Sequence, residues 1–149
     1  MPPLILNSVT VKYFDKNAPR LNLPNKGDFG IDLFANEDKE VFPGESYLIK
    51  TGICLQIEDE AYGFQIRDRS SKSKYYEVLA GIIDPSYTGE WLVRINLVTD
   101  LHYMIRKGDK IAQAIPMLNC LAYTKDLIEV EELLVKGDRL DKGFGSTGS

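Results

Sequence analysis

The sequence has few of the residues that mark disulfide-rich or zinc-binding proteins. Its 149 residues include two cysteines and one histidine. Two cysteines cannot build a disulfide framework, and their separation does not match a zinc motif. Cys54 and Cys120 both lie in apolar, strand-like surroundings. We therefore expect two buried thiols in a protein of a reducing compartment.

Long apolar runs and clusters of positive charge are also missing. No run approaches the length of a membrane span, and the first residues lack the regions of a signal peptide. The formal net charge is −4, with no Lys/Arg cluster, which argues against a nucleic-acid polymer as partner. These absences predict a protein bound to neither membrane nor nucleic acid, in the cytoplasm, or the host cytoplasm if the source is viral.

No segment of helix length shows a strong period of 3.6 residues. Short runs instead alternate apolar and polar residues with a period of two, which predicts strands. The predicted strands cover residues 9–13, 47–57, 62–66, 91–97 and 111–117, the last ended near Pro116. Residues 127–134 fit either a strand or a short helix. The pattern favours an all-β domain over residues 1–138, followed by a Gly- and Ser-rich tail over residues 139–149.

The stretch AGIIDPSYTGEW, residues 80–91, carries the most suggestive chemistry. Two apolar runs flank a turn, which predicts a β-hairpin with a longer-than-minimal loop. A carboxylate, Asp84, can accept a proton from water, and the ring of Tyr87 can lie flat against a sugar or base. The loop would then line a small-molecule pocket. An ordinary surface turn is the alternative, because Asp, Pro, Ser and Gly are common turn residues.

Three further polar clusters separate the predicted strands. The run Arg69-Ser70-Ser71 offers a guanidinium fork and two hydroxyls to phosphate oxygens, or caps a helix. Gln113 follows a turn at residues 108–110, and turn plus strand explains that cluster fully. The tail GFGSTGS could wrap an anion with its backbone N–H groups, with Phe144 as a stacking surface, or remain a disordered tail.

Five motifs occur in the order and approximate spacing of the trimeric dUTP pyrophosphatases (dUTPases), which the chain resembles from residue 27 to its end. They are FGIDLFA around Asp32, DRSS around Arg69, AGIIDPSYTGEW around Asp84, KGDKIAQAI around Gln113, and RLDKGFGSTG from Arg139. The resemblance implies an all-β fold, a distorted jelly-roll-like β-barrel with little helix. It also implies a homotrimer in which three subunits share each site and the C-terminal arm is exchanged between subunits.

The resemblance further implies hydrolysis of dUTP to dUMP and pyrophosphate, which keeps uracil out of DNA and supplies dUMP for dTTP synthesis. Asp84 resembles the carboxylate that activates the water attacking the α-phosphorus. Tyr87 resembles the ring that packs under deoxyribose and leaves no room for a 2′-hydroxyl. Backbone groups near Gly81, Ile83 and Asp84 would read uracil and reject the thymine methyl by crowding.

The phosphate-binding residues that the resemblance implies come from three of the motifs. Arg69, Ser70, Ser71 and Gln113 would hold the phosphates. The tail would close the site, with Phe144 over the uracil and the γ-phosphate covered by Arg139, Gly145, Ser146 and Thr147. Mg²⁺ would be held mainly by the triphosphate itself and by no direct protein ligand. Asp32 would be a supporting carboxylate near the phosphates and the metal.

The chain departs from the family pattern at several places. Asp68 stands where the family usually has proline, and it is expected to place a negative charge near the phosphates. Lys72-Ser73-Lys74 replaces small or apolar residues after the serines. Pro85-Ser86 replaces a more usual Ser-Asp before the tyrosine, and residues 140–142 replace smaller ones in the tail. We expect these departures to affect affinity and closure of the tail more than the type of reaction.

Three alternatives follow from the same motifs. A dCTP deaminase shares the Arg-Ser-Ser and Asp-Pro-x-aromatic-x-Gly elements but uses a glutamate further along the next strand, where this chain has Arg94. A nucleotide-gated binding module would be supported by an inserted segment, which this compact chain lacks. An all-β structural protein would leave the five motifs unexplained.

Overall fold

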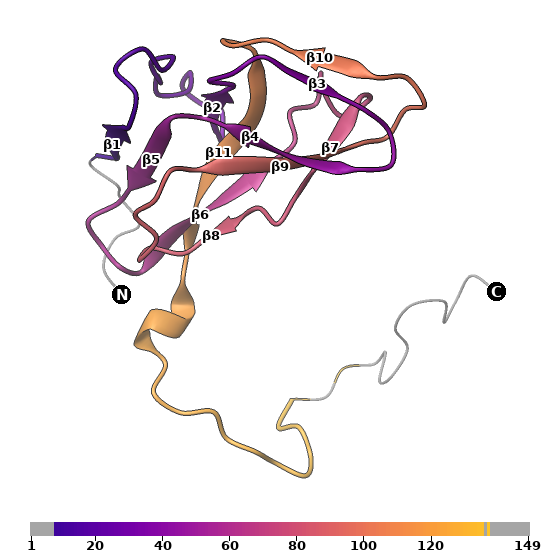
Figure 1. Cartoon of the computed structure of the whole chain (residues 1–149). Helices are drawn as coiled ribbons and strands as arrows, with labels where there is room; N and C mark the ends of the chain where they lie inside the picture. Colours follow the sequence, from indigo (N-terminus) through magenta and orange to yellow (C-terminus); the bar gives the residue numbers. More distant parts are fainter. Residues whose placement is uncertain (1–7, 136, 138–149) are drawn as a thin grey trace, which may run out of the picture.

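The structure, a computed structural model, describes residues 8–135 and Gly137. These residues form short strands and one 3₁₀ turn (Figure 1). The strands are β1 (Thr10–Tyr13), β2 (Ile31–Phe34), β3 (Lys39–Val41), β4 (Ser46–Lys50), β5 (Ile53–Gln56), β6 (Tyr62–Arg67), β7 (Tyr76–Leu79), β8 (Ile82–Ile83), β9 (Leu92–Leu97), β10 (Tyr103–Ile105) and β11 (Lys110–Leu118), and the 3₁₀ turn is η1 (Cys120–Tyr123).

The strands form two larger antiparallel sheets, of order β2-β11-β6-β8 and β4-β9-β7, and two smaller pairs, β1-β5 and β10-β3. In Figure 1 the β4-β9 layer lies in front of β11 and β6. The all-β prediction is therefore confirmed. Because the described strands are divided among four sheets, closure into one barrel stays a prediction, as does the domain boundary after residue 138.

The two larger sheets share one apolar core. Along β9, Val93, Ile95 and Leu97 are buried and alternate with more exposed residues, as a period of two requires. Trp91 is fully buried and meets the ring of Phe64, on the other sheet, edge-on at 5.2 Å between centroids. The two layers are therefore joined by interdigitated large side chains.

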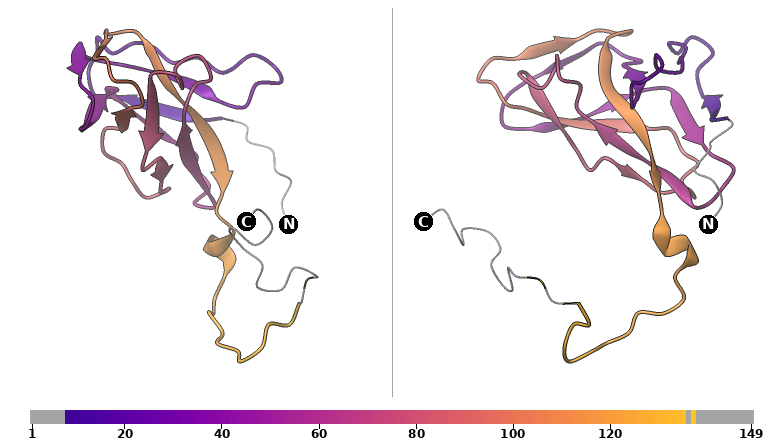
Figure 2. Two further views of the ribbon diagram at one scale, coloured as in Figure 1. Left: turned by 90° about the vertical axis from the view of Figure 1, so that its right-hand side faces the viewer. Right: turned by 180° about the vertical axis from the view of Figure 1, so that it is seen from behind.

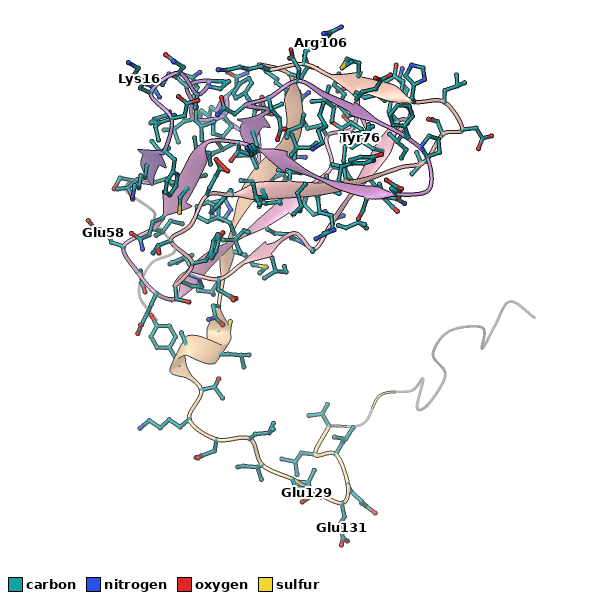
Figure 3. The ribbon with its side chains drawn as sticks, viewed as in Figure 1. Lys16, Glu58, Tyr76, Arg106, Glu129 and Glu131 are labelled. Atoms are coloured by element: carbon teal, nitrogen blue, oxygen red, sulfur yellow. The ribbon has the colours of Figure 1, made fainter. Side chains whose placement is uncertain are left out.

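A hydrogen bond across the core joins the same two sheets. The hydroxyl of Tyr76, on β7, donates to the carbonyl of Ile111, on β11, at 2.9 Å. Figure 3 shows Tyr76 directed into the body of the protein. Burial raises the pKa of Tyr76, so this hydroxyl remains a donor at neutral pH.

The predicted strand over residues 47–57 is wrong in one respect, because it is two strands. β4 pairs with β9, whereas β5 pairs with β1. The chain changes sheet at Gly52, whose φ of +71° is in the left-handed region. A Cβ there would lie 2.8 Å from the Asn36 amide nitrogen and 2.9 Å from the Ala18 Cβ, so the bend requires glycine on both counts.

The predicted hairpin over residues 80–91 is also wrong. β8 pairs with β6 in one sheet, and β9 pairs with β4 and β7 in the other. The position beside β9 is occupied by β7, a four-residue strand that the sequence pattern did not reveal. Asp84 and Tyr87 therefore lie on a crossover between the two sheets rather than at a hairpin tip.

Pro116 does not end its strand, because β11 runs on to Leu118. Pairing with β2 stops at Ala114, and beyond it β11 has β6 as its one described neighbour. A residue without an N–H group is tolerated where a strand is paired on one side.

The chain after η1 leaves the body of the protein (Figure 2), and Figure 3 shows Glu129 and Glu131 in this extended segment. Residues 124–135 contain neither the strand nor the helix expected over 127–134. Cys120 is exposed, contrary to prediction, because η1 lies outside the core, whereas Cys54 is buried as predicted. No helix among the described residues has the length and apolar character needed to cross a membrane.

Candidate active site

Sheet pairing brings three of the predicted phosphate-binding and supporting residues together. Gln113, on the central strand β11, is paired with Asp32 on β2 and with Arg67 at the end of β6. Arg69 follows β6 by two residues. Its Nε donates to Oδ1 of Asp32 at 3.0 Å, and its Nη1 is 3.4 Å from the Ser71 hydroxyl. One carboxylate thus fixes the direction of the guanidinium.

Lys110 belongs to the same cluster, although the sequence did not single it out as a site residue. Its Nζ lies 3.3 Å from Oδ2 of Asp32, so both oxygens of that carboxylate are paired with cations. Simple alternation would place residues 110 and 113 on opposite faces of a strand. A register shift between Lys110 and Ala112 brings the lysine to the Gln113 face. These groups are partly exposed, so the pairs matter more for geometry than for stability.

The Gln113 side chain is held on two sides. Its Nε2 donates to the Asp68 carbonyl at 2.9 Å. Its other flank lies against Gly30, where a Cβ would collide with Oε1 of Gln113. Gly30 is therefore a site residue that sequence reasoning missed, although it lies within the FGIDLFA motif.

These residues line a cavity of about 570 Å³, a volume suited to a small ligand. Asp32, Arg69, Ser70 and Gln113 are in its wall, together with Lys110 and the segment 22–30. Phe29, which is 84% exposed, stands at this wall as well. An arginine, a lysine, a hydroxyl and an amide around one hollow form a site for an anion with several oxygens.

Asp84 and Tyr87 occupy a different part of the molecule. They line a second cavity, of about 260 Å³, with Ile82, Ile83 and Leu92. Asp84 is exposed, and its carbonyl accepts from the Tyr87 N–H at 3.1 Å to close the turn. The Tyr87 hydroxyl donates to the Glu90 carbonyl at 2.9 Å, while 45% of the residue remains exposed. The hydrogen bond therefore holds the hydroxyl end of the Tyr87 ring, while the exposed part of the ring is accessible to a ligand.

Cys54 contacts the inner side of the loop that carries Tyr87. Its sulfur lies 3.7 Å from the Tyr87 carbonyl oxygen. Burial raises the pKa of the Cys54 thiol, so it stays protonated at neutral pH and can donate to that oxygen. The crossover is therefore fixed on its inner side as well as at the tyrosine hydroxyl.

β8 presents a free backbone edge beside Asp84. It is the last strand of its sheet among the described residues, with β6 on one side. The carbonyl of Gly81 accepts from the Ile66 N–H at 2.6 Å, and the Ile83 carbonyl faces Gly63. Because successive residues of a strand direct their backbone groups to opposite sides, the N–H and C=O of Ile82 face the unpaired edge. A planar ligand with its own donors and acceptors could pair there.

The two cavities have no lining residue in common. Register explains the separation. Asp84 follows Ile83, which pairs with Phe64, so it lies near Gly63 at the start of β6, whereas Arg69 lies beyond Arg67 at its end. Four residues of strand separate these levels by about 13 Å. The described residues therefore form two separate cavities, one around Arg69 and one around Asp84.

The remaining predictions concern the tail and the metal. Arg139, Phe144, Gly145, Ser146 and Thr147 lie outside the described residues. Within the part of the chain that the structure describes, no three acidic, histidine or cysteine side chains are grouped so that they could hold a metal ion.

Comparison with known proteins decides the family. A protein-family model described as dUTPase matches residues 16–148. This chain belongs to the dUTPase family. It is 39% identical over 143 residues to the deoxyuridine 5′-triphosphate nucleotidohydrolase of Caldanaerobacter subterraneus subsp. tengcongensis, covering 89% of this chain and 93% of that protein.

Solved dUTPase structures agree with this dUTPase chain in fold. The dUTPase of Staphylococcus bacteriophage 80alpha, solved with dUPNHPP, matches with a TM-score of 0.79 and 28% identity, over 96% of this chain and 99% of that one. A mutant dUTPase of phage phi11 of S. aureus, whose structure reveals the coordination of a structural Mg(II) ion, matches with a TM-score of 0.72 and 25% identity, over 87% and 100%.

Proposed function

We propose that the protein hydrolyses dUTP to dUMP and pyrophosphate by attack of an Asp84-activated water on the α-phosphorus, keeping uracil out of DNA and supplying dUMP for dTTP synthesis. The observation that supports the proposal is that one dUTPase-family chain carries two separate cavities of different chemistry, which we call its two halves. One half has an exposed carboxylate beside a pinned ring and a free strand edge. The other, which we call the phosphate half, consists of the residues around the 570 Å³ cavity, namely Asp32, Arg69, Ser70, Lys110 and Gln113.

The proposed chemistry follows from the charges of the two halves. Asp84 is exposed on its crossover, so its carboxylate can bind a water molecule and accept a proton from it. General base catalysis of this kind accelerates the chemical step by about 10²- to 10⁴-fold. Negative charge develops on the phosphate oxygens as the water attacks. The bond to Asp32 orients the Arg69 guanidinium in advance, so that it would stabilise that charge. Ser70, Ser71 and Gln113 would donate further hydrogen bonds to the phosphates.

The edge of β8 supports recognition of uracil. The base carries donors and acceptors along one side, and the backbone N–H and C=O of Ile82 face the edge of β8 that has no strand partner among the described residues. The Gly81 backbone lies so close to β6 that a Cβ would collide with the Ile66 carbonyl. Such a rigid edge fits uracil and crowds the extra methyl of thymine.

Tyr87 would exclude ribonucleotides by lying against the 2′ position of the sugar. Gly89 sets this ring position, because a Cβ there would lie 2.7 Å from the Tyr87 hydroxyl oxygen and 2.9 Å from the adjoining ring carbon. We expect Gly89→Ala to displace the ring, to raise the KM for dUTP about 3- to 10-fold, and to narrow the ratio of kcat/KM for dUTP over UTP.

Steady-state kinetics with both nucleotides test the Gly89 prediction. The control is Gly44→Ala, because a Cβ at Gly44 meets nothing within 4 Å and that turn is remote from the crossover, although its positive φ costs some stability. An unchanged dUTP-to-UTP ratio in Gly89→Ala would show that the ring position does not depend on this glycine.

Mg²⁺ is proposed to enter as part of the substrate, chelated by the triphosphate oxygens and water. Asp32, the carboxylate of the phosphate half, has both oxygens directed at cations. The bound metal would supply charge neutralisation at the phosphates.

A homotrimer would complete the site, with the Asp84 half of one copy facing the Arg69 half of another. The segment after η1 supports an arm exchanged between subunits. It leaves the body with Leu127 and Leu134 fully exposed, which is costly unless a neighbour covers them. Residues 139–149 would then close over the bound nucleotide. Free thiols at Cys54 and Cys120 support a cytoplasmic location.

The experiment that tests the proposed function is pyrophosphate release from dUTP, UTP, dTTP and dCTP in the presence of Mg²⁺. We expect rapid release from dUTP and at least about 100-fold lower kcat/KM for the other three. Ammonia released from dCTP would instead identify a deaminase. Equal rates on dUTP and UTP would remove Tyr87 from its proposed role.

A further inference from the structure

Asp68 lies in the loop that carries Arg69, and its carboxylate does not point at the phosphate half. Oδ1 of Asp68 accepts a hydrogen bond from the Val78 N–H at 2.6 Å. Asp68 is not among the residues that line the 570 Å³ cavity. It lines instead a cavity of about 230 Å³ on the far side of the loop, together with Val78 and Ile82. The Asp68 carboxylate, expected to lie near the phosphates, is therefore directed away from the 570 Å³ cavity.

The bond to Val78 joins the two larger sheets. Asp68 follows β6 of one sheet, and Val78 is in β7, the last strand of the other. β7 pairs with β9 on one side, so its second edge presents backbone groups without a strand partner among the described residues. The Asp68 carboxylate satisfies one of these N–H groups and ties the loop to a packed strand.

The main chain of Asp68 contacts the phosphate half directly. Its carbonyl accepts from Nε2 of Gln113 at 2.9 Å, and the next residue, Arg69, is bonded to Asp32. The carbonyl of Arg69 in turn accepts from the N–H groups of Lys72 and Ser73, each at 3.0 Å. The side chain and main chain of one residue thus hold the loop from opposite sides.

We propose that Asp68 is a positioning residue for triphosphate binding: its carboxylate, anchored on Val78, fixes the peptide that orients Gln113 and Arg69. The inference rests on the proposed function for its substrate. Without the anchor the loop loses its bond to Val78 of β7, and the peptide that orients Gln113 and Arg69 is held less firmly. The effect should fall on substrate binding, because Asp68 acts through Gln113 and Arg69 and its own side chain does not line the 570 Å³ cavity.

Two substitutions separate this role from general stability. Asp68→Ala removes the acceptor and is expected to raise the KM for dUTP about 3- to 10-fold with kcat within about twofold. Asp68→Asn keeps an acceptor oxygen for the Val78 N–H and is expected to restore a KM within about twofold of wild type. An Asn variant with a KM as high as that of the Ala variant would overturn the anchoring role.

Asp59→Ala is the matched control. Oδ1 of Asp59 also accepts a backbone hydrogen bond, from the Ala61 N–H at 2.9 Å, within the turn at the other end of β6. Both alanine variants should lose thermal stability, but the KM should rise in Asp68→Ala alone. Equal KM values in the two variants would show that Asp68 is structural and would overturn the proposal.

A measurement on the unaltered protein covers the case in which Asp68→Ala does not fold. Amide hydrogen exchange at Val78 is expected to slow at least about threefold when inorganic triphosphate binds, because binding fixes the loop and its anchor together. An unchanged rate at saturating triphosphate overturns the proposal. This readout needs no turnover, so a protein that bound triphosphate but did not hydrolyse dUTP would refute the proposed function and leave the Asp68 result readable.

Discussion

Asp84→Asn is expected to lower kcat for dUTP by about 10²- to 10⁴-fold, while the affinity for a non-hydrolysable dUTP analogue stays within about twofold. Asparagine has nearly the same shape but cannot take a proton from water. The turn around it should persist, because Asp84 contributes its main-chain carbonyl, not its carboxylate, to the bond with the Tyr87 N–H. The loss should therefore fall on the chemical step alone.

Single-turnover kinetics and calorimetric binding of the analogue measure the two quantities separately. Asp100→Asn, at an exposed carboxylate in the bend after β9, is the control and should leave both unchanged. If Asp84→Asn turned over dUTP at the wild-type rate, another group would have to be the base.

Arg69→Ala is the second large effect, a fall in kcat/KM of about 10²- to 10³-fold, with a higher KM and a lower kcat. The substitution removes the guanidinium fork that the phosphates would meet. It also leaves the Asp32 carboxylate paired with Lys110 alone, so more negative charge faces the incoming triphosphate. Arg69→Lys should lie between wild type and Arg69→Ala, because a lysine keeps the charge without the bidentate geometry.

Lys72→Ala is the control for loss of a cation in the same loop. Its Nζ contacts the Tyr103 hydroxyl at 3.2 Å rather than the phosphate cavity, so kcat/KM should change by less than about threefold. Steady-state kinetics on Arg69→Ala and Lys72→Ala measure kcat/KM for this comparison. An Arg69→Ala enzyme with wild-type kcat/KM would remove the arginine from the proposed phosphate half.

Strands that pack one face on the core could be predicted from the sequence. β6, β9 and most of β11 follow the period-two pattern because their inward residues must be apolar. The three-residue strands β3 and β10 and the edge strand β7 are too short for a pattern to show. The pairing partner of each strand was harder to predict. Whether β8 pairs with β9 or with β6 depends on contacts far apart in the sequence, which local alternation does not encode.

The motifs predicted residues that converge in the structure, but they did not predict the geometry around them. Asp32, Arg69 and Gln113 were predicted and do converge. Lys110 was missed because a bulge changes the face it presents, and the direction of the Asp68 carboxylate depends on a strand that was not predicted. The separation of the two cavities follows from strand register, which no motif contains. The chemical roles themselves came from the family resemblance, not from spacing.

The most direct test of the account is to co-express Asp84→Asn and Arg69→Ala chains, each nearly inactive alone, and to measure dUTP hydrolysis by the mixed oligomers. If the Asp84 half of one copy acts on phosphates held by another, random trimers regain about a quarter of the wild-type rate, because about three in four are mixed and each has one complete site of three. Activity no higher than that of the separate variants would contradict the shared site.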